Sequence, residues 1–117
     1  MKSATTFAEA DALQDLGKFD GAASRAYYSL YQALVPHFEK WYGKPSKLDP
    51  RADHWTHDMI RNNCARLVGG DGYRVVVMAF NLRIIADYRM KMCVAKRELD
   101  AVMTEIPAVL NKLGVKV

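Results

Sequence analysis

Arg83 and Asp87 are residues whose types and spacing could form either an ion pair or part of an anion-binding site. The two residues are four positions apart, so they share one face if this segment is a helix. Between them lie Ile84, Ile85 and Ala86, and a guanidinium beside so much apolar surface is either paired with an acid or bound to an anion. If the pair is simply exposed, it contributes only about 0.3 to 0.5 kcal/mol and has little functional meaning.

A second candidate is the tyrosine-rich segment 22–34, with the sequence AASRAYYSLYQAL. Small residues alternate there with tyrosines, and small residues let a neighbouring helix approach closely. Buried tyrosines need partners for their hydroxyl groups. Tyr27 and Tyr28 are therefore either structural residues of a packed core or the source of a hydroxyl for a ligand near Arg83.

Histidine ordinarily changes its charge near neutral pH, and the chain has three histidines. His54 and His57 flank a short Trp-Thr pair and could reach Arg83 across the fold or from a partner subunit. The alternative for both is a capping or core-edge position at a helix start. Arg51 and His57 also have five residues between them, a spacing that arises easily by chance in a loop.

The third histidine, His37, lies on the apolar stripe of a predicted helix, so we expect a hydrogen-bonded core residue there. Acids at Asp53 and Asp58 lie next to the other two histidines and would permit a metal ion. Their spacing does not match a defined ligand set, so no metal or cofactor is predicted.

Basic residues concentrate in segment 83–97, which has one acid, Asp87, and five bases: Arg83, Arg89, Lys91, Lys96 and Arg97. The excess of four positive charges equals the net charge of the whole chain, +4. Such a segment could contact phosphates or an acidic protein, or it could be a solvated helix end, since Glu98 and Asp100 follow. No aromatic residue lies between Arg89 and Arg97, which argues against base stacking along this segment.

The apolar spacing predicts the helices that must position these residues. A short helix is expected over residues 6–16, and a long one from Asp20, as its amino-terminal cap, to residue 41. Pro36 should bend the long helix or end it early. Residues 44–53 have no sustained period and are expected to form a loop.

The second half of the chain continues this pattern. A helix should begin near Asp53 and run to residue 68, where three glycines would stop it, Gly69, Gly70 and Gly72. The apolar segment 73–92 is predicted to be a buried helix despite its β-branched run, because its length exceeds that of a strand. A last helix should follow over residues 94–113, kinked at Pro107. Together these elements predict an all-α protein, an up-and-down bundle of four or five helices.

Length and composition restrict the class of protein. The chain has 117 residues, half of them hydrophobic, so residues 1–117 should form a single domain with an adequate core. Two cysteines are too few for a disulfide scaffold or a zinc cluster, which favours the reducing cytoplasm. Acids interrupt the amino terminus, and the longest uncharged run, 26–38, is too short to span a bilayer, so no membrane association is expected.

Three motifs occur in order along the chain: RAYYSLYQAL at 25–34, HWTH at 54–57 and RIIADY at 83–88. Their order and spacing resemble the HEPN domain family over nearly the whole chain. These small helical bundles occur in prokaryotic toxin–antitoxin systems and alongside nucleotidyltransferases. The resemblance implies a HEPN-like bundle that forms a homodimer through the apolar fourth helix, although this helix could instead be central within one chain.

Active HEPN ribonucleases typically carry an arginine followed, after four to six residues, by a histidine. Arg83 matches the arginine, but Asp87, Tyr88, Arg89 and Met90 follow it, with no histidine. Metal-independent RNA cleavage needs a cation for the phosphate and a group that accepts the 2′-hydroxyl proton. Tyr88, with an ordinary pKa of about 10, is a poor acceptor, and His57 would have to complete a composite site.

The candidate catalytic residues are therefore Arg83, His57 and Tyr88, and the candidate ligand-binding residues are Arg83, Asp87, Tyr88, Tyr27, Tyr28 and His54. The resemblance implies a toxin–antitoxin or defence component that binds RNA or a nucleotide phosphate around Arg83, in one version as an endoribonuclease. The alternative is a non-catalytic dimeric module that partners a nucleotidyltransferase. For the ribonuclease, Arg83→Ala should abolish cleavage and leave thermal stability nearly intact.

Overall fold

The computed structural model describes residues 2–89 and 92–117, and every regular element within these ranges is helical. The prediction of an all-α protein is confirmed, and the β-branched run at 75–77 is helical. The elements are α1 (Lys2–Asp15), α2 (Phe19–Tyr42), the short 3₁₀ helix η1 (Pro45–Lys47), α3 (His57–Asn63), α4 (Ala65–Tyr88) and α5 (Lys96–Lys112).

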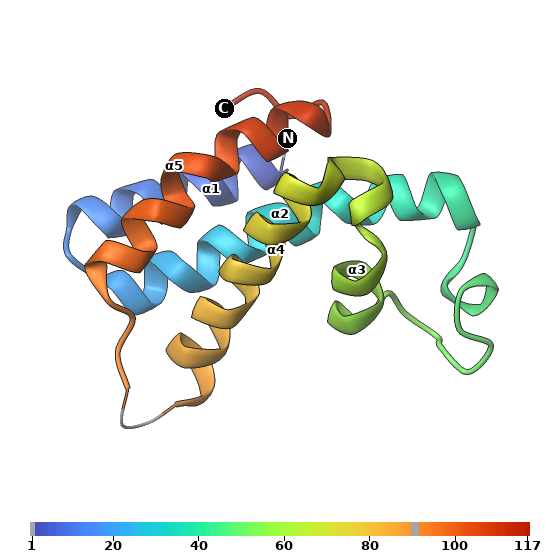
Figure 1. Cartoon of the computed structure of the whole chain (residues 1–117), viewed down its shortest axis with the longest axis horizontal. Helices are drawn as coiled ribbons and strands as arrows, with labels where there is room; N and C mark the ends of the chain where they lie inside the picture. Colours follow the sequence, from blue (N-terminus) through green and yellow to red (C-terminus); the bar gives the residue numbers. More distant parts are fainter. Residues whose placement is uncertain (1, 90–91) are drawn as a thin grey trace.

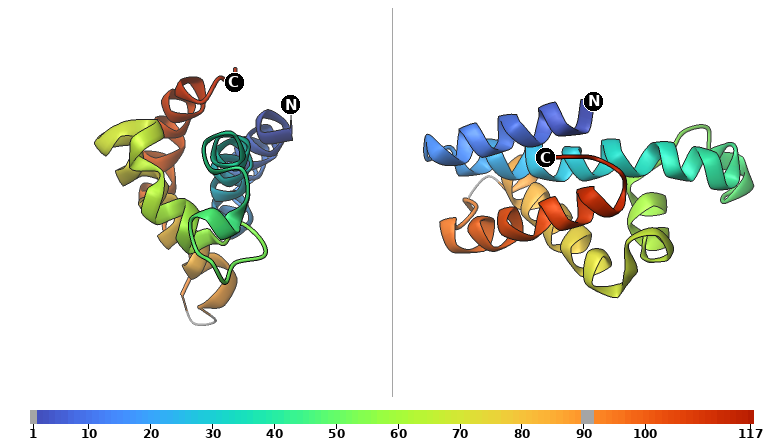
Figure 2. Two further views of the ribbon diagram at one scale, coloured as in Figure 1. Left: turned by 90° about the vertical axis from the view of Figure 1, so that its right-hand side faces the viewer. Right: turned by 90° about the horizontal axis from the view of Figure 1, so that it is seen from above.

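Helix α2 is the central element of the bundle (Figure 1). Helix α1 runs antiparallel beside it, and α3, α4 and α5 also contact it (Figure 2). The buried residues of α2 include several alanines, which let its neighbours approach closely: Ala22, Ala23, Ala26 and Ala33. The tyrosines of segment 22–34 are therefore carried by the helix that most of the fold packs against.

The first two helices differ from their predicted starts and caps. Helix α1 begins at Lys2, before the predicted residue 6, and α2 continues through Pro36 to Tyr42. The prediction that Asp20 caps α2 is wrong. Asp20 lies within the first turn, where its Oδ1 accepts the backbone N–H of Val94 at 2.9 Å. This carboxylate ties the segment before α5 to the start of α2.

The predicted helix from Asp53 to residue 68 is wrong at its start, whereas its predicted end is confirmed by the break at Gly69. Thr56 caps α3, because its Oγ1 accepts the backbone N–H of Met59 at 3.2 Å, and the helix begins at His57. The glycines break the helix as predicted, and a second helical segment continues beyond them to Tyr88. They produce a kink in α4 at Gly69, whose φ of 77° and ψ of 177° are accessible to glycine but not to other residues.

The second half of α4 carries Arg83 and ends at Tyr88, earlier than the predicted residue 92. Lys91 of the basic segment and Met90 lie outside the described residues. Helix α5 begins at Lys96 and continues through Pro107. Within the described parts of the chain, no helix has the combined length and hydropathy to cross a membrane.

Candidate functional site

Arg83 lies in the carboxyl-terminal half of α4, and its side chain is only 8% exposed. Its Nε–H donates to Asp87 Oδ2 at 3.2 Å, which confirms the predicted pairing across one helical turn. Its Nη2 donates to two phenol oxygens, that of Tyr28 at 3.2 Å and that of Tyr88 at 3.3 Å. The guanidinium is thus held from its own helix and from α2.

Three aromatic rings surround the same guanidinium. Arg83 Cζ lies 5.5 Å from the ring centroid of Tyr27, 5.2 Å from that of Tyr28 and 5.5 Å from that of Tyr88. These distances fall within the range of cation–π attraction, which strengthens where water is excluded. The rings therefore offset part of the desolvation cost of the buried cation.

Asp87 is positioned by both helices as well. The hydroxyl of Ser24 on α2 lies 3.2 Å from each carboxylate oxygen, and the Asp87 side chain is 31% exposed. Sequence reasoning did not select Ser24. The sequence does indicate its position, because Ser24 lies four residues before Tyr28 and therefore on the same face of α2.

A second polar contact joins α2 to the start of α3. The hydroxyl of Tyr27 lies 2.8 Å from His57 Nδ1, and Tyr27 is only 1% exposed. Burial raises the pKa of the Tyr27 phenol well above its ordinary value, so the hydroxyl stays protonated. Its proton has no other acceptor among the described residues, so Tyr27 donates to Nδ1 and the His57 proton is on Nε2.

Partial burial, together with the positive charge of Arg83, lowers the pKa of His57 below its ordinary value. The imidazole is therefore neutral at pH 7 and directs an N–H donor away from Tyr27. Its ring centroid lies 4.6 Å from that of Tyr31, whose hydroxyl donates to the backbone oxygen of Trp55 at 2.6 Å. Tyr31 is a second positioning residue that sequence reasoning missed, although it is four residues after Tyr27 on α2.

One nitrogen of the guanidinium remains available. Arg83 Nη1 has no hydrogen-bond partner among the described residues, and it is not one of their enclosed, unpartnered polar atoms. Beside the cluster, Ser24, Tyr28 and Asp87 help to line an open cleft of about 720 Å³, which Arg25 and Asp20 also border, whereas Arg83 itself does not line it. A cation and several hydroxyl groups beside an open cleft suit an oxyanion such as phosphate.

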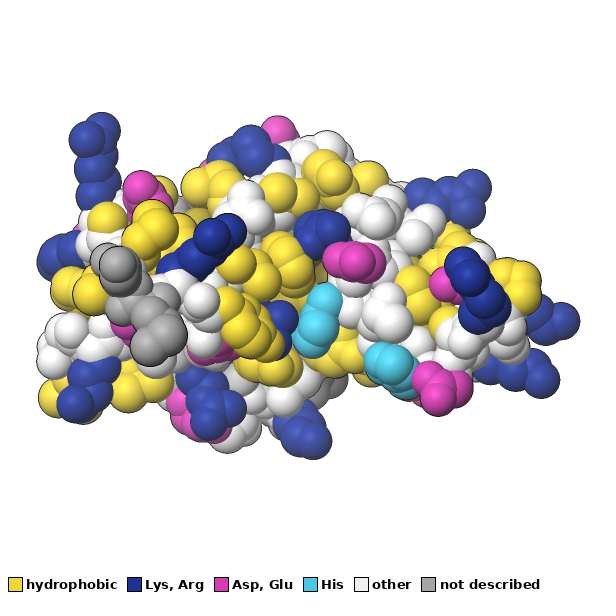
Figure 3. All heavy atoms as spheres, turned by 90° about the horizontal axis from the view of Figure 1, so that it is seen from below, with side chains coloured by type: hydrophobic (Ala, Val, Ile, Leu, Met, Phe, Trp, Pro, Cys, Tyr) yellow, Lys and Arg dark blue, Asp and Glu magenta, His cyan; other side chains and the backbone are white. Residues whose placement is uncertain are grey.

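The surface around this region is mixed in character. Figure 3 shows basic and histidine side chains among hydrophobic ones on the face seen from below. Tyr88 is 63% exposed, and Arg89 also lies on the surface. An anionic ligand at Arg83 would thus meet an aromatic ring and a second cation nearby.

Other sequence candidates lie outside the Arg83 cluster. The His54 side chain is 74% exposed and its Nδ1 lies 2.7 Å from Asp53 Oδ1. Arg51 is exposed in the loop before α3. His37 is hydrogen-bonded as predicted, since its Nε2 lies 2.9 Å from the backbone oxygen of Leu113, but it is half-buried rather than in the core.

Two remaining features are possible metal ligands and the basic segment 83–97. The described residues contain no group of three or more side chains arranged to hold a metal ion. In the basic segment, Lys96 pairs with Asp100 at 2.6 Å, and Arg97 is exposed. The segment therefore resembles a solvated helix start at α5 more than a continuous patch.

No protein-family model matches the chain, and neither curated proteins nor solved structures include a significant match to it. The arrangement of Arg83, Asp87 and the tyrosines therefore carries the functional assignment.

Proposed function

We propose that this chain is a HEPN-like module that binds RNA or a nucleotide phosphate at the Arg83 cluster. The observation that carries the proposal is Arg83 Nη1, which has no hydrogen-bond partner among the described residues, in a cluster whose Tyr28 and Asp87 line an open cleft. Arg83 holds the anion, and Asp87 orients Arg83. Of the two tyrosines considered for a hydroxyl, Tyr28 suits the role, because the Tyr27 hydroxyl is engaged by His57.

We place the module in a cytoplasmic toxin–antitoxin or related defence system and propose that it acts as a homodimer. Helix α4 supports the dimer, since it carries apolar residues that one chain leaves partly exposed, among them Val77, Met78, Ile84 and Ile85. A second subunit that covers these residues would bring two Arg83 clusters near one another. His54, which is exposed, would then be able to approach the partner's cluster.

The enzymatic version of the proposal makes His57 the proton acceptor for metal-independent RNA cleavage. The hydrogen bond from Tyr27 leaves the proton on His57 Nε2, so His57 can accept a proton there only after the Tyr27 hydroxyl turns to accept from Nδ1–H. Tyr27→Phe would remove that requirement. It should leave cleavage in place and change its pH profile, whereas His57→Asn should abolish cleavage.

The binding test uses a fluorescent single-stranded RNA in EDTA, with anisotropy for binding and gel analysis for cleavage. Arg83→Lys keeps the charge but loses the planar fork, so it should weaken binding at least tenfold, or about 1.4 kcal/mol. Arg74→Ala is the matched control on the same helix, because Arg74 is paired with Glu105 at 2.7 Å outside the cluster. Equal affinities for Arg83→Lys and the wild type would contradict the proposal.

The internal hydrogen bonds and the burial of Arg83 favour a second function. With three hydrogen bonds and 8% exposure, the guanidinium also suits a structural lock between α2 and α4 in a non-catalytic dimeric module. The partner would then be a nucleotidyltransferase. This function predicts no cleavage under any condition and recovery of a nucleotidyltransferase in pull-downs from host cells, with Arg83→Lys and the wild type recovering it equally.

A further inference from the structure

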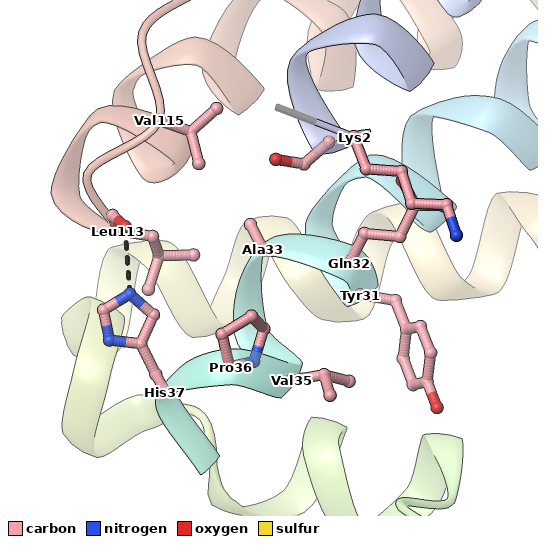
Figure 4. Close-up of a pocket in the computed structure, with 10 residues that line it drawn as sticks. Lys2, Tyr31, Gln32, Ala33, Val35, Pro36, His37, Leu113 and Val115 are labelled. Carbon is pink, nitrogen blue, oxygen red and sulfur yellow. Dashed lines mark hydrogen bonds between the residues drawn. The ribbon is translucent and has the colours of Figure 1, made fainter. Parts of the chain in front are cut away.

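A pocket separate from the Arg83 cluster lies where the start of α1, the middle of α2 and the chain after α5 meet. Its volume is about 490 Å³, within the size range of small-molecule sites. Figure 4 shows Ala33, Val35 and Pro36 of α2 on one side and Leu113 and Val115 of the carboxyl-terminal segment on the other. The walls are therefore mostly aliphatic and come from segments far apart in the sequence.

The polar groups of the pocket are few. Ser3 lines it, is 2% exposed, and has the one enclosed side-chain oxygen without a hydrogen-bond partner among the described residues. A buried hydroxyl without a partner is unfavourable, so a ligand that supplies an acceptor would be favoured there.

The charged side chain that lines the pocket is basic. Lys2 is the only Lys, Arg, Asp or Glu residue in its lining, and the described residues form no ion pair with it. His37 also lines the pocket, and its Nε2–H donates to the backbone oxygen of Leu113 (Figure 4). A cation without an acid partner, beside a mostly apolar pocket, suits a ligand with an apolar body and an anionic head.

We propose that this pocket binds a medium-chain aliphatic carboxylate. The hydrocarbon chain lies against Val35, Pro36 and Leu113, and the carboxylate accepts hydrogen bonds from Lys2 and Ser3. The affinity of such a ligand depends on chain length, because each added methylene that is buried strengthens binding roughly threefold to fourfold.

The test is isothermal titration of the whole chain with hexanoate, octanoate and decanoate below their micelle concentrations. Octylamine and octanol, which have the same chain length as octanoate, are the matched ligands. We expect saturable binding at one site per chain, stronger with each methylene until the pocket is filled, with octanoate at least tenfold tighter than octylamine.

Substitutions at Lys2 and Ala33 test whether the ligand binds in this pocket, and Lys40→Glu is the control. Lys2→Glu changes an exposed residue at the start of α1 and should weaken octanoate binding at least tenfold, whereas Lys40→Glu makes the same charge change outside the pocket and should have no effect. Ala33→Leu should fill the pocket and abolish binding, with circular dichroism as its folding control. If Ala33→Leu does not fold, the Lys2 and Lys40 pair still decides the outcome.

Three results would overturn the proposal. The first is no saturable binding, and the second is equal binding of octanoate, octanol and octylamine with no effect of Lys2→Glu. The third is a concentration-dependent dimer that Ala33→Leu disrupts without octanoate binding, because a second copy would then occupy the pocket.

Discussion

The replacement of Arg83 by alanine should destabilise the protein strongly, in contrast to the expectation from sequence that stability would be nearly unchanged. The side chain is 8% exposed and donates three hydrogen bonds, to Asp87, Tyr28 and Tyr88. Hydrogen bonds that involve a charged group contribute about 1.5 to 3 kcal/mol each when buried. Two of these acceptors are partly exposed, Asp87 at 31% and Tyr88 at 63%, so their contributions fall below that range.

These contributions, with the loss of the buried aliphatic stem, give an expected cost of about 3 kcal/mol. For a domain of this size, that corresponds to a decrease in Tm of roughly 10 °C. Asp87→Ala should cost about 2 kcal/mol, because it leaves Arg83 with phenol acceptors only and removes the partner of Ser24. The two changes share one contact, so the double variant should be less destabilised than their sum by about 1 to 2 kcal/mol.

The assay is urea unfolding of the four members of this cycle, followed by circular dichroism. Arg74→Ala is the control, and it should cost far less than Arg83→Ala because both side chains of its ion pair are exposed. A cost for Arg83→Ala no larger than that of the control, or strict additivity with Asp87→Ala, would refute the assignment of Arg83 as a buried and internally paired cation.

Three further predictions concern the glycines of α4, His57 and the contact between Asp20 and Val94. Gly72→Ala should cost about 1 to 3 kcal/mol, because an added Cβ would lie 2.6 Å from Val68 Cβ, whereas Gly70→Ala has no atom within 4 Å and should be neutral or slightly stabilising; urea unfolding of both variants checks this. The pKa of His57 is lowered in the folded state, so the unfolded chain binds more protons as the pH falls below about 6.5, and stability should decrease on acidification through this range. His57→Gln should flatten that dependence between pH 7 and 5, and an unchanged slope would contradict it. Asp20→Ala should cost about 1 to 2 kcal/mol and accelerate amide exchange at Val94, whose N–H loses its acceptor; unaltered exchange would argue against the contact.

Local sequence patterns predicted the features of the fold that depend on one helix. The regular spacing of Ala26, Leu30 and Leu34 predicted α2, and the four-residue spacing of Arg83 and Asp87 predicted their ion pair. The glycines correctly predicted a break in the helix, which the structure has at Gly69, whereas Gly70 and Gly72 lie in the helical segment that follows.

Features that depend on two helices were not predictable in the same way. The contact between Tyr27 and His57 joins α2 to α3, and Asp20 reaches Val94 across 74 positions of sequence. Asp20 resembles a helix cap in sequence, and its true partner is fixed only by how α4 and the following segment return to α2. Ser24 was overlooked for the same reason, since its importance comes from Asp87 on another helix.

The most direct test of phosphate binding is NMR observation of the arginine side-chain N–H groups during titration with 5′-AMP or a short oligoribonucleotide. The account predicts a saturable shift of the Arg83 Nε and Nη resonances, with Arg74 unchanged and the Arg83 response reduced in Tyr88→Phe. Arg83 resonances that stay fixed at saturating nucleotide, or equal shifts at every exposed arginine, would contradict a phosphate site at this guanidinium.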